Sequence, residues 1–282
     1  MKIAVLGAGG LLGRTFDALA RAGGHETLAL SRRDCDVADE AAVARALEAF
    51  RPAALVNGAA YTDVDRAEKD MEACFRTNAV GPGALARAAE TLGARLVHVS
   101  TDYVFDGEKG APYVESDPTN PRGVYAISKL EGERAALAAS PRAIVARTAW
   151  LYGPGGKNFV SKMPEILREK GEMGAVADQW SSPTRADELA KALLAMLARE
   201  VPGGLYHVSA TGKASYHEVA LEAARALGIA PEKVRPTEAR ALVRPAPRPR
   251  ATPLASEKLP ALGIALRDWR EAYREFALAS AR

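Results

Sequence analysis

The chain of 282 residues is poor in cysteine, in aromatic residues and in net charge, and each shortage excludes a class of protein. Two cysteines cannot form a disulfide framework, and thiols this sparse are typical of a reduced, cytoplasmic protein. A net charge of +3 gives no reason to expect a nucleic-acid partner. No apolar run approaches the roughly 20 residues that a membrane-spanning helix needs, so we expect no membrane partner either.

The composition that is present is that of a globular protein, with 48% hydrophobic and 26% charged residues. Short apolar runs alternate with helical patterns through the first half, which predicts an α/β fold built on a doubly wound parallel sheet. The expected strands are Lys2–Leu6, Glu26–Leu30, Ala54–Asn57, Arg95–Ser100 and Arg142–Thr148. The expected helices are Leu11–Ala22, Glu40–Phe50, Met71–Leu92 and Tyr125–Ala139.

This alternation weakens after about residue 150. We interpret 1–150 as a dinucleotide-binding domain and 151–282 as a small substrate-binding lobe, some of whose segments return to the sheet. The lobe is expected to contain helices at 159–169, 186–198, 216–227 and 266–278 and a strand at 205–208. The proline-rich stretch Pro231–Pro253 reads as a long surface connection.

Glycines at positions 7, 10 and 13 follow the first expected strand and open the first helix. Gly7 lets the chain turn out of the strand, Gly10 lets the backbone approach a pyrophosphate, and Gly13 lets the helix pack on the sheet. The helix N-terminus then offers N–H groups to that anion. This spacing is typical of the Rossmann fold of extended short-chain dehydrogenases and predicts NADPH or NADH as cofactor.

The end of the second expected strand bears on the choice between the two cofactors. An acid there would favour NADH, whereas the chain reads Ser31-Arg32-Arg33, with acids only at Asp34 and Asp36. Ser31 and Arg32 therefore indicate that a 2′-phosphate is accepted. Asp36 and Val37 could hold the adenine edge.

Tyr125 and Lys129 lie four residues apart, on one face of the expected helix. An ammonium beside a phenol, together with an oxidised nicotinamide, would lower the pKa of that phenol. Tyr125 could then protonate the oxygen of a carbonyl that accepts a hydride. Thr101 follows the fourth expected strand at the edge where doubly wound sheets bind ligands, and its hydroxyl could bind that oxygen.

These residues sit in a set of motifs that resembles the dTDP-4-dehydrorhamnose reductases over nearly the whole chain. The motifs are Ser100–Gly107 with Tyr125 and Lys129, Asn57–Glu68, Arg147–Gly153 and Asp178–Thr184, with weaker similarity at 248–254 and 268–270. The family reduces the 4-keto group of dTDP-4-dehydro-L-rhamnose with NADPH or NADH, to give dTDP-L-rhamnose. The resemblance implies a dTDP-sugar substrate.

The resemblance also implies roles for individual residues. It assigns catalysis to Thr101, Tyr125 and Lys129. It adds to the cofactor site Leu11, Leu12, Ala59, Ala60, Tyr61 and Thr62. It places against the substrate Asp102, Tyr103 and Trp150. Arg248 would pair with the diphosphate, because a guanidinium matches phosphate oxygens in two places.

Some members of the family join two subunits through a metal, Mg²⁺, that is held in part by an acid near the glycine loop. Thr15 stands at that position, so the resemblance leaves both the metal and a homodimer open. No histidine or cysteine has metal-ligand spacing, and we expect no metal ligands. His98, inside an apolar strand, is interpreted as a core residue.

Two other functions remain open. The regulatory β subunit of methionine adenosyltransferase resembles the same family and binds NADP without catalysing a reduction. A reductase of another dTDP-4-keto-6-deoxy sugar would share every motif named above.

Overall fold

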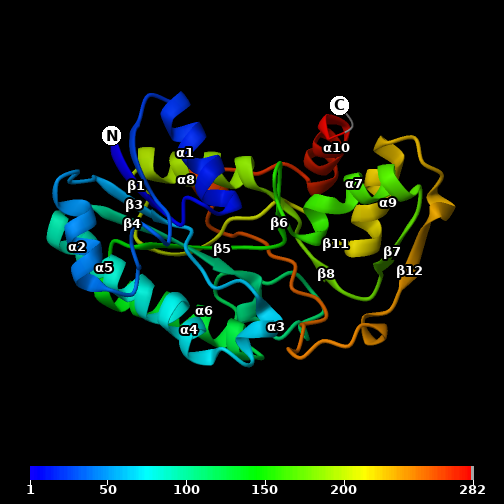
Figure 1. Cartoon of the computed structure of the whole chain (residues 1–282), viewed down its shortest axis with the longest axis horizontal. Helices are drawn as coiled ribbons and strands as arrows, with labels where there is room; N and C mark the ends of the chain where they lie inside the picture. The colour runs from blue at the N-terminus through cyan, green and yellow to red at the C-terminus, as the bar shows by residue number, and fades with distance from the viewer. Residues whose placement is uncertain (281–282) are drawn as a thin grey trace.

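The computed structural model describes residues 1–280, and the last two residues of the expected lobe, 281–282, lie outside the described part. Within it, a six-stranded parallel sheet has the order β10-β5-β4-β3-β1-β2 (Figure 1). The strands are β1 (Lys2–Leu6), β2 (Glu26–Leu30), β3 (Ala54–Asn57), β4 (Arg95–Thr101), β5 (Ile144–Thr148) and β10 (Gly204–His207). The predicted doubly wound parallel sheet is confirmed.

The strands β1, β2 and β3 have the bounds that their sequence predicts. β1 and β3 are apolar runs that are almost wholly buried, as interior parallel strands require, whereas β2 lies at the sheet edge and is partly exposed. β4 is one residue longer than expected and brings Thr101 into register with Thr148 of β5. β5 begins two residues later than expected, at Ile144. The strand order reverses beside β1, so the loops after β1 and β3 meet at the switch point.

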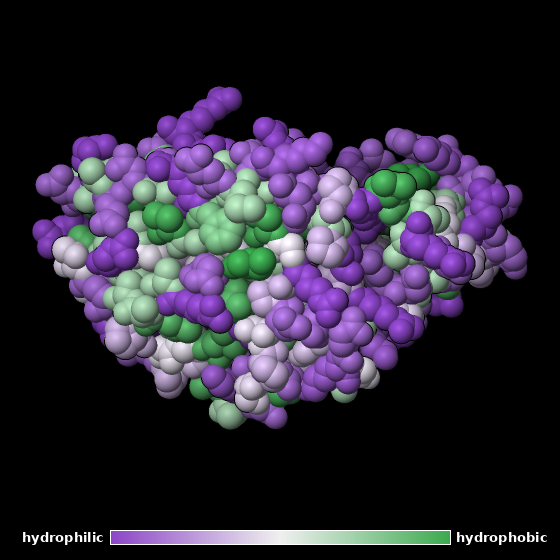
Figure 2. Space-filling view, turned by 90° about the horizontal axis from the view of Figure 1, so that it is seen from below, coloured by the Kyte–Doolittle hydropathy of each residue, from purple (hydrophilic) through white to green (hydrophobic). Residues whose placement is uncertain are grey.

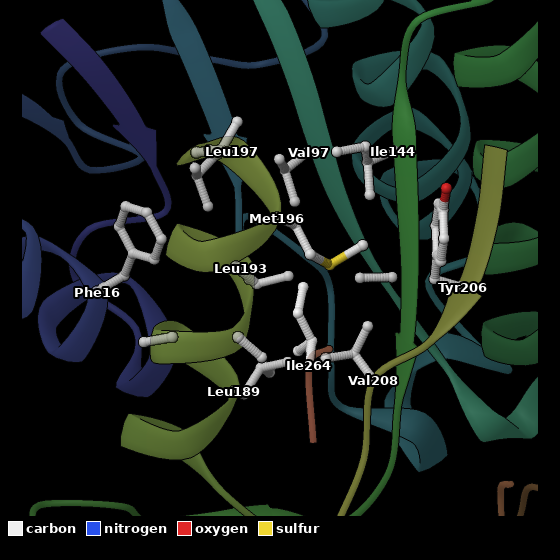
Figure 3. Close-up of a cluster of buried hydrophobic side chains, with 14 of the residues drawn as sticks. Phe16, Val97, Ile144, Leu189, Leu193, Met196, Leu197, Tyr206, Val208 and Ile264 are labelled. Carbon is white, nitrogen blue, oxygen red and sulfur yellow. The ribbon is translucent and has the colours of Figure 1, made fainter. Parts of the chain in front are cut away.

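Helices cover both faces of the sheet. On one face α1 (Leu11–Ala22) and α8 (Ala186–Ala198) pack together, and Figure 3 shows Phe16, Leu189, Leu193 and Met196 meeting the strands. The other face is covered by α2 (Glu40–Glu48), α5 (Gly81–Leu92) and α6 (Val124–Ala139). The buried side chains between α1, α8 and the sheet form the first core. The helix α8 and the strand β10, which come from the second half of the chain, complete this first core.

The expected helix at Met71–Leu92 is divided by a π-helical turn. The segment consists of α4 (Met71–Phe75), the π turn η1 (Arg76–Val80) and α5. Inside the turn, the Asn78 side chain accepts a hydrogen bond from the Tyr61 N–H at 2.8 Å and donates to the Tyr61 carbonyl at 3.1 Å. Such turns gather at functional sites, and this one supports a loop of the expected cofactor site.

The lobe has a hydrophobic core of its own, on the right in Figure 1. Its helices are α7 (Phe159–Lys170), α9 (Tyr216–Ala226) and α10 (Trp269–Ala279). Paired short strands link them: β6 (Leu151–Tyr152) with β9 (Thr184–Arg185), β7 (Met173–Val176) with β12 (Val234–Thr237), and β8 (Trp180–Ser181) with β11 (Ala214–Ser215). The helix α10 begins three residues later than expected because Asp268 caps it, accepting from the Arg270 N–H.

The interpretation of Pro231–Pro253 as a surface connection holds for its largely exposed middle part, 238–245, and fails at both ends. Its first part forms β12, which pairs in parallel with β7. Its last part runs beside β8, where the Trp180 N–H donates to the Arg250 carbonyl and the Thr252 N–H donates to the Trp180 carbonyl. Composition alone does not reveal these long-range partners. Among residues 1–280, no helix has the length and apolarity to cross a bilayer.

Candidate functional site

The glycine loop after β1 forms a tight backbone turn. Gly7 has φ +77°, and a Cβ there would lie 2.5 Å from the Ala59 nitrogen. A Cβ on Gly13 would lie 2.3 Å from the Gly7 carbonyl oxygen, so only glycine fits where α1 meets the loop. Gly10 is the N-cap residue of α1, and because glycine has no side chain it makes no side-chain capping hydrogen bond. The first N–H groups of the helix therefore remain available to a ligand.

A cavity opens at the switch point, between the loops that follow β1, β2 and β3. Its lining comprises Gly7, Gly9, Gly10, Arg32, Cys35, Asp36, Val37, Gly58, Ala59, Ala60, Tyr61, Ala73, Arg76 and Thr77. Several expected cofactor residues do not line this cavity: Leu11, Leu12, Gly13, Ser31 and Thr62. Leu12 is buried in the first core, and the Ser31 hydroxyl donates to Asp34. Arg76 and Thr77 were missed because the π turn that presents them has no clear sequence signal.

Two acids after β2 are already engaged. Asp34 accepts from the N–H and the hydroxyl of Ser31, and these bonds hold its pKa below the usual value. Asp36 lies 2.7 Å from the Arg76 guanidinium, which lowers the pKa of that carboxyl. No ion pair among residues 1–280 engages Arg32, which is exposed at the cavity edge. The cavity edge therefore carries the positive charge of Arg32, which has no carboxylate within ion-pair distance among residues 1–280.

Tyr125 and Lys129 lie on α6 as predicted, one turn apart. Lys129 is almost completely buried, and its Nζ donates to the Val99 carbonyl at 2.7 Å. Burial lowers the pKa of Lys129 to about 8, against the opposing charge of Glu133 one turn further along. Glu133 is itself held by Arg147 of β5, with 2.6 Å between a guanidinium nitrogen and a carboxylate oxygen.

The surroundings of Tyr125 in the protein alone act against the lowering expected of Lys129 and an oxidised nicotinamide together, and that lowering stays a prediction. Burial raises the pKa of the Tyr125 phenol, and the Thr101 hydroxyl offsets only part of that rise. The ring of Tyr103 meets that of Tyr125 edge-on, with centroids 5.9 Å apart, and contributes to the apolar surroundings. Desolvation of the phenolate therefore outweighs the neighbouring amine, and Tyr125 carries its proton at neutral pH.

Thr101 and Asp102 connect the sheet to the lobe. The Thr101 hydroxyl donates to one Asp102 oxygen at 3.1 Å, and the Ser181 hydroxyl donates to the other at 2.7 Å. Thr252 donates to the same oxygen as Ser181. Burial raises the pKa of Asp102 to about 6, and the three hydroxyls offset it only in part. The roles of Ser181 and Thr252 were missed because they come from distant segments.

The remaining expected substrate residues lie where the lobe approaches the sheet. Trp150, at φ +38°, stacks on Tyr216 of α9 with 3.7 Å between ring centroids. Arg248 is not a solvated loop charge, because it forms an ion pair with Asp65 at 3.0 Å. The charges of Arg248 and Arg244 both act on Tyr216, so these groups share one region. Tyr216 and Arg244 were not anticipated, since neither belongs to a local motif.

The position expected to help hold Mg²⁺ carries no acid. The Thr15 hydroxyl donates to the Leu11 carbonyl, inside its own helix, and provides no carboxylate. Across residues 1–280, no group of three or more histidine, cysteine, aspartate or glutamate side chains could hold a metal ion.

Comparison with known proteins gives a consistent result. The model of the RmlD substrate binding domain family matches residues 1–281. A dTDP-4-dehydrorhamnose reductase of Mycolicibacterium smegmatis is 43% identical over 97% of this chain and 84% of its own length. The crystal structure of a dTDP-4-dehydrorhamnose reductase from Clostridium acetobutylicum has a TM-score of 0.94 at 35% identity, covering 100% of both chains. That of the Bacillus anthracis enzyme in complex with NADP has a TM-score of 0.93 at 30% identity, covering 99% of both.

Proposed function

The chain belongs to the RmlD substrate binding domain family, that of the dTDP-4-dehydrorhamnose reductases, and we propose that it reduces the 4-keto group of dTDP-4-dehydro-L-rhamnose to give dTDP-L-rhamnose. It is an NAD(P)-dependent oxidoreductase. The observation that carries the proposal is the arrangement of Tyr125 and Lys129 of α6 against the end of β4, where Thr101 lies. Tyr125 packs against the same small cluster of buried residues as Tyr61, which lines the dinucleotide cavity.

The residues around the cavity fit a dinucleotide. The Gly7 turn and the uncapped end of α1 would hold the pyrophosphate, and Arg32 would meet a 2′-phosphate. The reduced nicotinamide would supply a hydride to the substrate carbonyl carbon. Arg32 supports a preference for NADPH over NADH, since Asp34 and Asp36 are bound to other groups.

Tyr125 acts as the proton donor. As the carbonyl becomes an alkoxide, its oxygen gains basicity and takes the phenolic proton. Because burial keeps the Tyr125 phenol protonated, the donor is in the correct state for reduction at neutral pH. Lys129 acts beside it as a buried ammonium whose charge favours the phenolate left behind.

Thr101 orients the substrate oxygen. A hydroxyl has one proton to donate, and in this structure Asp102 receives it. When Asp102 is protonated it can donate to Thr101, which frees the Thr101 proton for the carbonyl oxygen. The raised pKa of Asp102, about 6, brings that protonated state close to the physiological range.

The nucleotide part of the substrate is proposed to lie along the lobe. The stacked pair of Trp150 and Tyr216 offers an aromatic surface to a base or sugar. Arg248 and Arg244 bring positive charge to the same region, as a diphosphate requires. Arg248 would exchange or share its contact with Asp65 on binding.

The test is NADPH oxidation, followed by absorbance, with dTDP-4-dehydro-L-rhamnose and with a panel of other dTDP-4-keto-6-deoxy sugars. We expect turnover that falls by about 10²–10⁴ in Tyr125→Phe. The matched control is Tyr206→Phe, a tyrosine of β10 whose hydroxyl donates to the Pro202 carbonyl. If only another dTDP-sugar is reduced, that sugar is the substrate. If the protein binds NADP but reduces no sugar, the function of a regulatory subunit is favoured.

A homodimer without a bridging metal is also proposed. Met71, Val80 and Ile127 are exposed apolar residues on α4, η1 and α6. These elements pack together below the sheet, and the face seen in Figure 2 carries apolar residues over its left half. Sedimentation should give a dimer that Ile127→Glu dissociates and that chelators leave unchanged.

A further inference from the structure

A buried polar row crosses the sheet beneath α6. His98 of β4 lies between Asn57 of the neighbouring strand β3, its register partner, and Lys129 of α6. Its Nδ1 is 3.0 Å from the Asn57 Nδ2, and its Nε2 is 3.5 Å from the Lys129 Nζ. The exposed fractions of Asn57, His98 and Lys129 are 0%, 0% and 2%. His98 is thus a core residue, as the sequence predicts, but one that contacts a catalytic side chain.

The orientation of the Asn57 amide follows from a backbone contact. The Ala59 N–H, which can only donate, points at the Asn57 Oδ1 at 3.0 Å. The amide nitrogen of Asn57 therefore faces His98, and His98 Nδ1 must accept. Burial and the charge of Lys129 hold the pKa of His98 well below its usual value, so the ring is neutral. A neutral imidazole that accepts at Nδ1 carries its proton on Nε2, and the network assigns that tautomer.

We propose that His98 is a positioning residue for Lys129: Asn57 holds its imidazole with the proton on Nε2, and this N–H faces the Lys129 amine and disfavours the ammonium. An ammonium has no lone pair to accept that N–H, whereas a neutral amine has one. The part that relates to catalysis rests on the function proposed above, but the tautomer does not depend on turnover.

The other groups that face Lys129 do not cancel this effect. Glu133 favours the ammonium, but both of its oxygens are bound by Arg147 and one also by Ser100. Cys74 of α4 contributes little charge, because burial raises the pKa of its thiol. The Val99 carbonyl accepts from Nζ in either state. The lowered pKa of Lys129, about 8, agrees with this balance.

The position of Lys129 has a consequence for turnover. Its Nζ is held one helical turn from Tyr125, between the Val99 carbonyl and His98 Nε2. The protonation state of Lys129 sets the positive charge near the phenolate that Tyr125 leaves when it gives up its proton. Loss of the ammonium at alkaline pH should therefore slow turnover.

The first test is the tautomer of His98 in the unmodified protein. Long-range proton–nitrogen NMR spectra distinguish the two neutral tautomers, and His98→Gln assigns the signals by removing them. We expect a neutral ring protonated on Nε2 that does not titrate from about pH 5 to 8. A ring protonated on Nδ1, or an imidazolium in that range, would overturn the proposal.

The second test changes the tautomer through Asn57→Asp. A carboxylate accepts from both Ala59 and His98, which moves the proton to Nδ1 and turns Nε2 into an acceptor for the ammonium. The titration of Lys129, followed by carbon NMR of its labelled Cε and assigned with Lys129→Arg, should then rise by about one pH unit or more. His98→Gln should leave it near the original value, because an amide can accept from Asn57 and donate to Lys129.

The charge that Asn57→Asp adds needs its own control. The double variant Asn57→Asp, His98→Met keeps the carboxylate without the ring, and its shift should be less than half as large. Equal shifts in the two variants, or lower melting temperatures with no change in the Lys129 titration, would contradict the proposal. The alkaline limb of kcat/KM for NADPH oxidation should move with the titration. If no dTDP-sugar is reduced, the proposed function fails. The two NMR experiments still test the tautomer of His98 and its effect on Lys129, because neither depends on turnover.

Discussion

Glu133→Gln is expected to destabilise the protein strongly, because it leaves a buried guanidinium without its counter-charge. The side chains of Arg147 and Glu133 are 4% and 3% exposed, and their two hydrogen bonds are 2.8 and 2.6 Å long. Removing one partner of such a pair costs about 3–5 kcal/mol. Solvent screening does not reduce that cost, because water reaches neither side chain.

Urea unfolding of the variant and the original protein measures this difference. The matched control is Glu131→Gln on the same helix, whose pair with Arg134 is 43% and 63% exposed. That exposed pair should contribute only about 0.3–0.5 kcal/mol. Replacing Glu133 and Arg147 together by methionine should recover most of the loss, since no buried charge then remains unpaired. A Glu133→Gln loss no larger than that of Glu131→Gln would refute this reasoning.

Three further outcomes follow from the site. Gly13→Ala should weaken NADPH binding, measured by calorimetry, about tenfold or more, because the new Cβ would lie 2.3 Å from the Gly7 carbonyl oxygen. An unchanged affinity would show that α1 can move to accommodate the methyl group. Arg32→Ala should lower the affinity for NADPH roughly tenfold and leave the affinity for NADH unchanged. An equal loss of affinity for both cofactors would show that Arg32 does not contact the 2′-phosphate. Burial raises the pKa of Asp102 to about 6, above its value of 3.8 in the unfolded chain, so the folded state binds its proton more tightly. The unfolding free energy should therefore fall by about 3 kcal/mol as pH rises from roughly 4 to 6, and Asp102→Asn should lack this fall.

The predictable parts of this molecule are those that local spacing determines. The Gly7 turn and the helix that follows it need only neighbouring residues, and the strands β1 and β3 are indicated by nearly continuous apolar runs. The pairing of Tyr125 with Lys129 follows from one helical turn. Each of these features would survive in many different tertiary arrangements.

The parts that escaped prediction depend on segments that meet only in the folded chain. The motif around Asp102 predicts that this residue binds the substrate, yet one of its carboxylate oxygens accepts hydrogen bonds from Ser181 and Thr252 of the lobe. His98 reads as a core residue, and its contact with Lys129 requires the docking of α6 on β4. The effect of burial on the pKa of Tyr125 could not be anticipated, because burial cannot be judged from spacing. The division of the chain near residue 150 stays an interpretation.

Single-turnover reduction of dTDP-4-dehydro-L-rhamnose by the NADPH-loaded protein and by its Tyr125→Phe variant tests the role of Tyr125. We expect rapid loss of NADPH absorbance in the original protein, a rate lower by about 10²–10⁴ in the variant, and equal NADPH affinity in both. A variant that reduces the sugar at the original rate would show that the phenol of Tyr125 is not the proton donor.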